Sequence, residues 1–123
     1  MKNLIRLAEQ GDVDSQFELG VIYAHGKDVK QDYEQAVFWF QKAAENGHIG
    51  AMSNLGIHYC LGQGCAIDYA QGLMWWENAA NLGEATAIYN LGVAYAEGKI
   101  VKRNLSKATE LFLQAEELGC ELA

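Results

Sequence analysis

The sequence predicts an all-α fold, a right-handed α-α superhelix (solenoid) of helical hairpins, and three observations support this prediction. Similar residues recur every 36 positions, so that Leu19-Gly20 returns as Leu55-Gly56 and again as Leu91-Gly92. Within each unit the apolar residues follow the three- and four-residue spacing of one helix face. The 123 residues include no proline, and no stretch shows the alternation that is typical of a strand.

The repeat register predicts a single domain over 1–123 that is built from helical hairpins. Asp32, Asp68 and Asn104 are expected to cap the second helix of each hairpin, because short polar side chains accept hydrogen bonds from free backbone N–H groups. Helices are expected at 2–10, 13–25, 32–46, 49–61, 68–82, 85–97 and 104–118. The units are a half repeat at 1–11, repeats at 12–47, 48–83 and 84–119, and a tail at 120–123.

Ten of the thirteen glycines occupy three recurring positions. Two of these positions are expected to end helices, where glycine adopts the left-handed conformation. They hold Gly26, Gly62 and Gly98, and Gly11, Gly47, Gly83 and Gly119. The third position lies mid-helix, where glycine costs about 1 kcal/mol relative to alanine. We therefore expect another helix backbone to approach closely at Gly20, Gly56 and Gly92.

Two adjacent indoles, Trp75 and Trp76, raise the alternative of an aromatic cage for a cation or a sugar. The register aligns Trp76 with Phe40 and Phe112, so this position is aromatic in all three copies. A position that every copy repeats is more typical of packing than of recognition. Trp75 aligns with Trp39 and Leu111 and so also occupies a repeat position. We therefore predict that Trp76 packs in the core on the second helix of its hairpin.

The recurring motifs resemble the Sel-one-like repeat family, relatives of the tetratricopeptide repeats with a longer turn. The motifs are LGVIYAHG, LGIHYCLG and LGVAYAEG, followed by AVFWFQKAAENG, GLMWWENAANLG and ATELFLQAEELG. The third copy departs from the family pattern at Leu111 and Glu116. The resemblance implies a non-enzymatic scaffold or adaptor, common in bacteria, that binds proteins on a curved surface. Some members act as inhibitors or immunity proteins, which is a narrower expectation for this chain.

The composition argues against several classes of partner. Nine basic and sixteen acidic side chains give a net charge of −7, which repels nucleic-acid phosphates and anionic lipid surfaces. No apolar run approaches the roughly 18 residues that a membrane span needs, and MKNLIRLAEQ is not a signal peptide. With three cysteines, an odd count, we expect a cytoplasmic protein with reduced thiols, or a periplasmic one if a leader was removed.

Few residues suggest catalysis or a metal site. His58, Cys60 and Cys65 form HxCxxxxC, but His58 and Cys60 point about 200° apart on a helix, and zinc requires convergent ligands. We expect no metal, no cofactor and no catalytic residue; a Cys60–Cys65 disulfide is the alternative to small buried thiols. His25 and His48 are expected to be solvated. The alternative function is a hydrolase acting on β-lactam or cell-wall fragments, or a fragment of a larger regulatory protein.

By analogy with tetratricopeptide arrays, the first helix of each hairpin is expected to line a concave groove that binds a peptide or protein. An alternative is that the next hairpin covers part of this stripe. Self-association through the exposed repeat ends is a further expectation, because the last helix is only partly capped by polar residues. The candidate groove residues are Asp14, Phe17, Glu18, Val21, His25, Ser53, Asn54, Ile57, Leu61, Tyr89, Asn90, Val93 and Glu97.

Overall fold

The computed structural model describes residues 1–119, and within them it contains seven α-helices and no strand. The six helices after the first are each thirteen residues long, as a strict repeat requires. The expected tail at 120–123, with Cys120, lies outside the described residues. The helices are α1 (Lys2–Glu9), α2 (Val13–His25), α3 (Tyr33–Glu45), α4 (Ile49–Leu61), α5 (Tyr69–Asn81), α6 (Ala85–Glu97) and α7 (Leu105–Glu117).

The predicted helix ends are confirmed to within two residues, and their chemistry explains where they fall. Asp32, Asp68 and Asn104 each accept a hydrogen bond from the backbone N–H three residues later, at 3.2, 3.1 and 3.0 Å. They are thus the N-caps of α3, α5 and α7. Gly26 and Gly62 end α2 and α4 in the left-handed conformation, both with φ of 71°.

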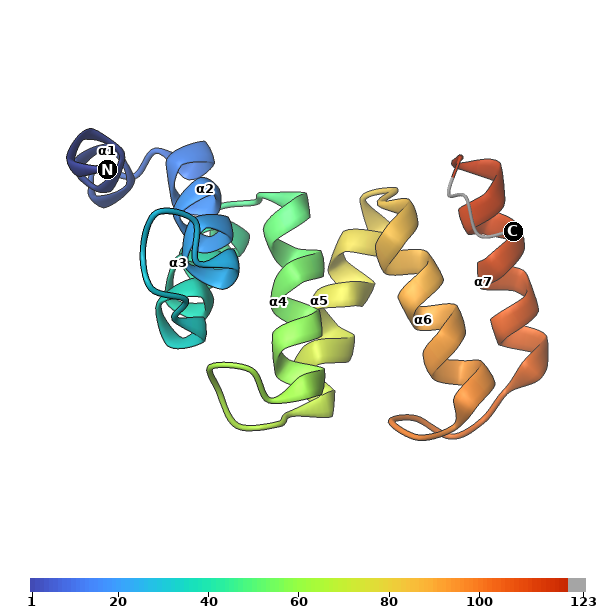
Figure 1. Ribbon diagram of the computed structural model, residues 1–123. Helices are drawn as coiled ribbons and strands as arrows, with labels where there is room; N and C mark the ends of the chain where they lie inside the picture. The colour runs from blue at the N-terminus through green and yellow to red at the C-terminus, as the bar shows by residue number, and fades with distance from the viewer. Residues whose placement is uncertain (120–123) are drawn as a thin grey trace.

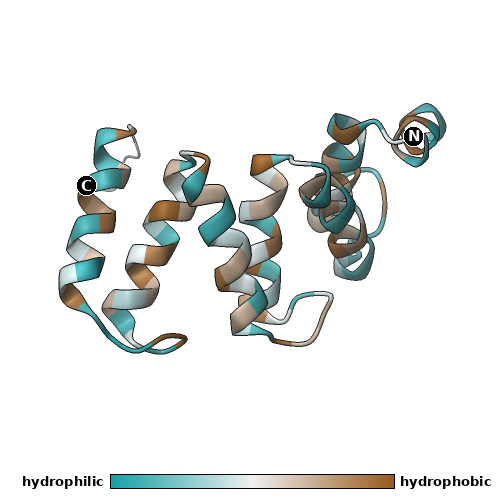
Figure 2. Ribbon diagram, turned by 180° about the vertical axis from the view of Figure 1, so that it is seen from behind, coloured by the Kyte–Doolittle hydropathy of each residue, from teal (hydrophilic) through white to brown (hydrophobic). Residues whose placement is uncertain are grey.

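The helices form an all-α solenoid. Each first helix packs against the second helix of its own hairpin, and each second helix packs against the first helix of the next. Figure 1 shows the helices following one another from α1 at one end to α7 at the other. Figure 2 shows hydrophobic and hydrophilic residues mixed along every helix, as expected where only one face is buried. No helix within residues 1–119 combines the length and apolar character needed to cross a membrane.

The mid-helix glycines make room for aromatic rings, which corrects the expectation that a helix backbone would fill this space. A Cβ atom on Gly20 would lie 2.5 Å from the Phe40 ring, and one on Gly92 would lie 2.8 Å from the ring of Phe112. At Gly56 backbone also comes close, with the carbonyl oxygen of Gly72 at 3.0 Å from the added Cβ, whereas the three nearest atoms at Gly20 and Gly92 all belong to the ring. The recurring glycine and the recurring aromatic residue are therefore two halves of one packing contact.

Both tryptophans of the middle repeat are buried, which confirms the prediction that Trp76 packs in the core. Trp75 is 8% exposed and Trp76 is 7% exposed. The indole N–H of Trp76 donates a hydrogen bond to the carbonyl oxygen of Ser53 at 3.1 Å, which ties α5 to α4. Within residues 1–119, Trp75 Nε1 is the sole buried side-chain nitrogen or oxygen without a hydrogen-bond partner.

Candidate functional site

A cavity of about 200 Å³ lies between the first two hairpins and collects part of the predicted groove. Val21 and His25 reach it from α2, and Asn54 reaches it from α4, so two successive first helices share one recess. The second helix of the first hairpin contributes aromatic rings, and the turn after α4 contributes an amide side chain. The remaining lining residues are Ala24, Tyr33, Phe40, His58 and Gln63.

His58 is the buried polar residue of this cavity, at 6% exposure. Its Nδ1 lies 3.0 Å from the carbonyl oxygen of Gln63. A carbonyl oxygen only accepts, so Nδ1 carries the proton and the neutral ring keeps its lone pair on Nε2. The imidazole contacts the rings of Tyr33 and Phe40, each with a centroid separation of 5.6 Å. Burial lowers the pKa of His58, which favours this neutral form.

A second cavity, of about 520 Å³, lies between α1 and α2 and contains the predicted groove residue Glu18. Glu18 and Ile22 stand 36 residues before Asn54 and His58, and Leu4 stands 36 residues before Phe40. This is therefore the same recess one repeat earlier. In the first cavity, α2 supplies one wall. The second cavity is larger because the half repeat has no first helix to supply the corresponding wall. Its lining residues are Met1, Asn3, Leu4, Leu7, Glu18, Ile22, Lys27 and Asp28.

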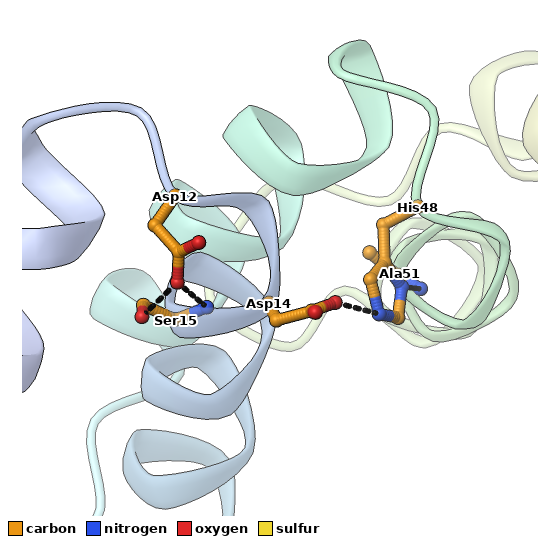
Figure 3. Close-up of polar contacts among 5 residues, drawn as sticks. All are labelled: Asp12, Asp14, Ser15, His48 and Ala51. Carbon is orange, nitrogen blue, oxygen red and sulfur yellow. Dashed lines mark hydrogen bonds and ion pairs between the residues drawn. The ribbon is translucent and has the colours of Figure 1, made fainter.

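Asp14 and Phe17 of the first hairpin both lie beside His48, at the start of the second. Figure 3 shows Asp14 pointing toward His48. The Phe17 ring stacks on the imidazole with centroids 4.2 Å apart and 15° between the planes. His48 Nδ1 accepts a hydrogen bond from the Ala51 N–H at 3.1 Å and so caps α4, while Nε2 lies 3.8 Å from Asp14 Oδ1. The expectation that His48 is solvated was wrong, because the helix cap and the stacked ring hold it half-buried.

Ser53 does not face the groove. It is 5% exposed, and its hydroxyl donates a hydrogen bond to Glu84, the N-cap of α6. The Glu84 carboxylate also accepts from the backbone N–H groups of Thr86 and Ala87, at 2.9 and 3.2 Å. Ser53 thus supports the junction between the second and third hairpins instead of contacting a ligand.

Sequence reasoning missed the caps of the first helices. Asp12, His48 and Glu84 occupy one repeat position, and each side chain accepts from backbone N–H groups at the start of its helix. The signal was present as a 36-residue spacing directly before each first helix. Three different residue types concealed it, because only Asp belongs to the residues usually preferred at an N-cap.

The other predicted groove residues lie outside both cavities. Tyr89 is half-buried, with its ring 5.6 Å from that of Phe112, so it packs between α6 and α7. Leu61, at the end of α4, is 60% exposed. Ile57, Asn90 and Val93 are half-buried on α4 and α6, and Glu97 is exposed at the end of α6.

The cysteines that break the repeat are free thiols within the described part of the chain, not a disulfide. Burial raises the pKa of Cys60, and burial together with the negative charge of Asp68 raises the pKa of Cys65. Both groups are therefore held as thiols, the opposite of what a nucleophilic cysteine requires. Cys60 Sγ occupies space that a Cβ on Gly72 would overlap, so the larger thiol and the smaller glycine compensate each other.

Comparison with known proteins identifies the repeat. The Sel1 repeat matches residues 13–48, 49–84 and 85–120. The chain belongs to the Sel1 repeat family. Sel1-repeat proteins are generally protein-interaction scaffolds, and this fold is typically non-enzymatic. Each matched repeat begins one residue after the boundary that the glycine positions suggested.

Three solved structures are similar to this Sel1 repeat chain. The protective antigen c5321 of uropathogenic Escherichia coli is 40% identical, with a TM-score of 0.90 over 94% of this chain. This chain spans only 25% of that antigen. A Sel1 repeat protein from Oxalobacter formigenes is 35% identical with a TM-score of 0.82, and the match covers 98% of this chain and 90% of that one.

The third structure, Helicobacter pylori cysteine rich protein B, is 20% identical with a TM-score of 0.73. That match covers 98% of this chain and 86% of that chain, and at this identity it supports the fold alone. No curated protein sequence matches the chain.

Proposed function

We propose that this Sel1 repeat chain binds a peptide or protein segment along the surface formed by the first helices α2, α4 and α6, the concave side of the solenoid. The observation that carries the proposal is the recess shared by Val21, His25 and Asn54. It places apolar and hydrogen-bonding groups from successive hairpins side by side. Such a mixture suits a ligand that extends across several repeats.

The thirteen candidate residues divide into framework and contact positions. Phe17 and Ser53 hold neighbouring hairpins together through His48 and Glu84. Asp14 lies 3.8 Å from His48 but its side chain is 95% exposed, so it is counted among the contact positions. The contact positions are those left open to a ligand. They include the amides of Asn54 and Asn90 as hydrogen-bonding groups for a peptide backbone, with His25 and Leu61 exposed at helix ends.

A narrower version of the proposal is a small inhibitor or immunity protein that neutralises an effector protein. The net charge of −7 supports a basic partner, because opposite charges accelerate association. Screening by salt weakens such steering. If this version is correct, association with the captured partner slows several-fold when the ionic strength rises from about 0.02 M to about 0.3 M. An association rate that does not respond to salt rejects the basic partner but leaves the groove proposal standing.

The test of the groove compares variants on the two faces of the hairpins. Asn54→Ala, Leu61→Ala and Asn90→Ala change the first helices, whereas Phe38→Ala and Met74→Ala change large exposed side chains of the second helices, which are 49% and 40% exposed. Immobilised wild type and each variant are used to capture partners from lysate. We expect the first set to lose the partner and the second set to retain it. The reverse pattern would move the binding surface to the second helices.

Self-association through the repeat ends remains a separate proposal. Met1 and Leu7 of the half repeat are 48% and 43% exposed, so α1 offers an apolar face. At the other end, α7 exposes Leu105 and Leu113, at 54% and 56%, beside the acids Glu116 and Glu117. Both ends thus offer apolar side chains, and we expect any association to join α1 of one molecule to α7 of another. Sedimentation equilibrium of wild type and Leu7→Glu over a concentration series tests this, and monomer alone in the wild type rejects it.

A further inference from the structure

Two residues that break the 36-residue register lie close together beside the cavity between the first two hairpins: His58, which lines it, and Cys65. His58 stands where the first repeat has Ile22, and Cys65 stands where it has Val29. Cys65 Sγ lies 3.6 Å from the His58 carbonyl oxygen, within reach of a weak hydrogen bond. A Cβ on Gly64 would overlap the backbone of Tyr33, so the turn after α4 is fitted against the first hairpin. At this recess the middle repeat therefore carries side chains that differ from those of the first repeat. The packing that the repeats share does not require these differences.

The Nε2 edge of His58 makes no hydrogen bond to the described part of the chain. Nδ1 is occupied by the Gln63 carbonyl oxygen, and no protein group bonds Nε2 within the described residues. Nε2 of His58 is not fully buried without a partner. Within residues 1–119, Trp75 Nε1 is the sole side-chain nitrogen or oxygen in that situation. Since His58 lines the cavity and is only 6% exposed, the cavity is the route by which solvent reaches Nε2.

The remaining walls of the cavity fit a flat ring. Tyr33 and Phe40 supply aromatic surface, and Val21 and Ala24 supply aliphatic surface. The volume of about 200 Å³ is sufficient, since an apolar protein cavity of about 150 Å³ admits benzene. No carboxylate lines the cavity, so a cationic side chain would find no opposite charge there.

We propose that this cavity receives an aromatic side chain carrying one hydrogen-bond donor, a tyrosine or a tryptophan, from the bound peptide or protein, with the donor directed at His58 Nε2. The proposal rests on the proposed function and names the group that anchors the partner. Tyrosine and tryptophan combine a large apolar body with a single polar handle, and they dominate the binding energy of many interfaces.

Two small probes separate the hydrogen bond from the shape of the cavity. The intact ¹⁵N-labelled chain is titrated with p-cresol, the tyrosine side-chain analogue, and with toluene, which has the same ring without the donor. Backbone amide shifts of the cavity residues and the His58 ring nitrogens report the site. We expect p-cresol to bind about fivefold more tightly than toluene, which corresponds to about 1 kcal/mol, the net value of one hydrogen bond. Equal affinities, or no shifts at the cavity, would overturn the proposal.

Two variants with matched controls test the assignment. His58→Ile installs the residue that the first repeat carries at this position, so the fold has a precedent for it. We expect it to remove the preference for p-cresol while toluene still binds. Ala24→Leu fills the cavity and is expected to abolish binding of both probes, whereas Ala96→Leu, the equivalent change in the third hairpin, leaves both unchanged. A preference that survives in His58→Ile would overturn the role of Nε2.

The anchor proposal and the groove proposal can be rejected separately. Leu61 and Asn90 do not line this cavity, so their variants test the groove separately. If neither probe binds but Leu61→Ala and Asn90→Ala still release a captured partner, the groove stands and this anchor is rejected. If p-cresol binds as expected but those variants retain the partner, the anchor pocket stands and the extended groove is rejected.

Discussion

The backbone of Gly56 lies against the indole of Trp76, so closely that a Cβ atom on Gly56 would overlap Cδ1 and Nε1 of the ring. The added atom would also lie 3.0 Å from the carbonyl oxygen of Gly72. The ring and the two glycines thus set the separation of α4 and α5. Because Trp76 is 7% exposed and hydrogen-bonded to Ser53, it has little freedom to move away.

Gly56→Ala is therefore expected to destabilise the protein by about 1–3 kcal/mol, although alanine is the better helix former by about 1 kcal/mol. The comparison is Gly92→Ala, where the added Cβ meets the half-buried Phe112 ring at 2.8 Å. That ring can shift, so we expect a smaller loss. Urea unfolding followed by far-UV circular dichroism measures both. Equal losses would contradict the proposed role of the Trp76 ring.

Trp76→Ala is expected to cost about 3–5 kcal/mol, because it empties the space that the Gly56 position reserves for a ring. Trp76→Phe restores the residue that stands at this position in the other two repeats, so we expect it to recover more than half of that loss. It still leaves the Ser53 carbonyl oxygen without its indole donor. The same unfolding measurement applies, and the folded fraction of either variant should keep its partner specificity. Full stability with lost binding would instead indicate a ligand site.

Glu84→Ala removes the N-cap of α6 and the acceptor of the Ser53 hydroxyl together. We expect a loss of about 1–3 kcal/mol, combining a lost cap with a buried hydroxyl left unpaired. Glu84→Gln keeps an oxygen acceptor and should lose less. The double variant Ser53→Ala/Glu84→Ala provides the control in equilibrium unfolding. If the two single losses add without coupling, the hydrogen bond between these side chains contributes nothing to stability.

Stability should depend on pH through His58. Burial places the pKa of His58 in the folded chain below 6.5, the value of a histidine side chain in an unstructured peptide. As the pH falls, the unfolded chain binds the proton first. The free energy of unfolding therefore decreases as the pH drops through 6.5, and it levels off below the pKa of His58 in the folded chain. Unfolding free energies of wild type and His58→Ile are compared at about pH 7.5 and about pH 5.5. We expect the wild type to lose more, and because His25 and His48 are present in both proteins, equal losses would exclude His58 as the source.

Much of the helical framework was predictable from the sequence. The N-caps Asp32, Asp68 and Asn104 and the burial of Trp76 follow from positions that every repeat shares. A repeated position reports a contact that each hairpin makes in the same way. The periodic pattern therefore located the helices and the aromatic core without any knowledge of how the hairpins stack.

The candidate site was only partly predictable, because its residues make contacts that differ from one repeat to the next. Phe17, Ser53 and Tyr89 share one repeat position, yet Phe17 stacks on His48, Ser53 bonds to Glu84, and Tyr89 packs against Phe112. Phe17 and Ser53 each touch the next hairpin, where the contacted side chain differs from repeat to repeat. Tyr89 instead packs on Phe112 of its own hairpin, as Phe17 also packs on Phe40. Helix-face analogy treats the three as equivalent and so cannot separate framework from groove.

By itself, the sequence determined the number of hairpins, their helix boundaries and the identity of the residues that pack inside each one. The tertiary structure decided that Phe17 stacks on His48, that Ser53 bonds to Glu84, and that His58 faces a cavity between two hairpins. The physical reason is the range of the interactions. Contacts within a hairpin recur with the 36-residue period, whereas contacts between hairpins join positions whose side chains are not repeated.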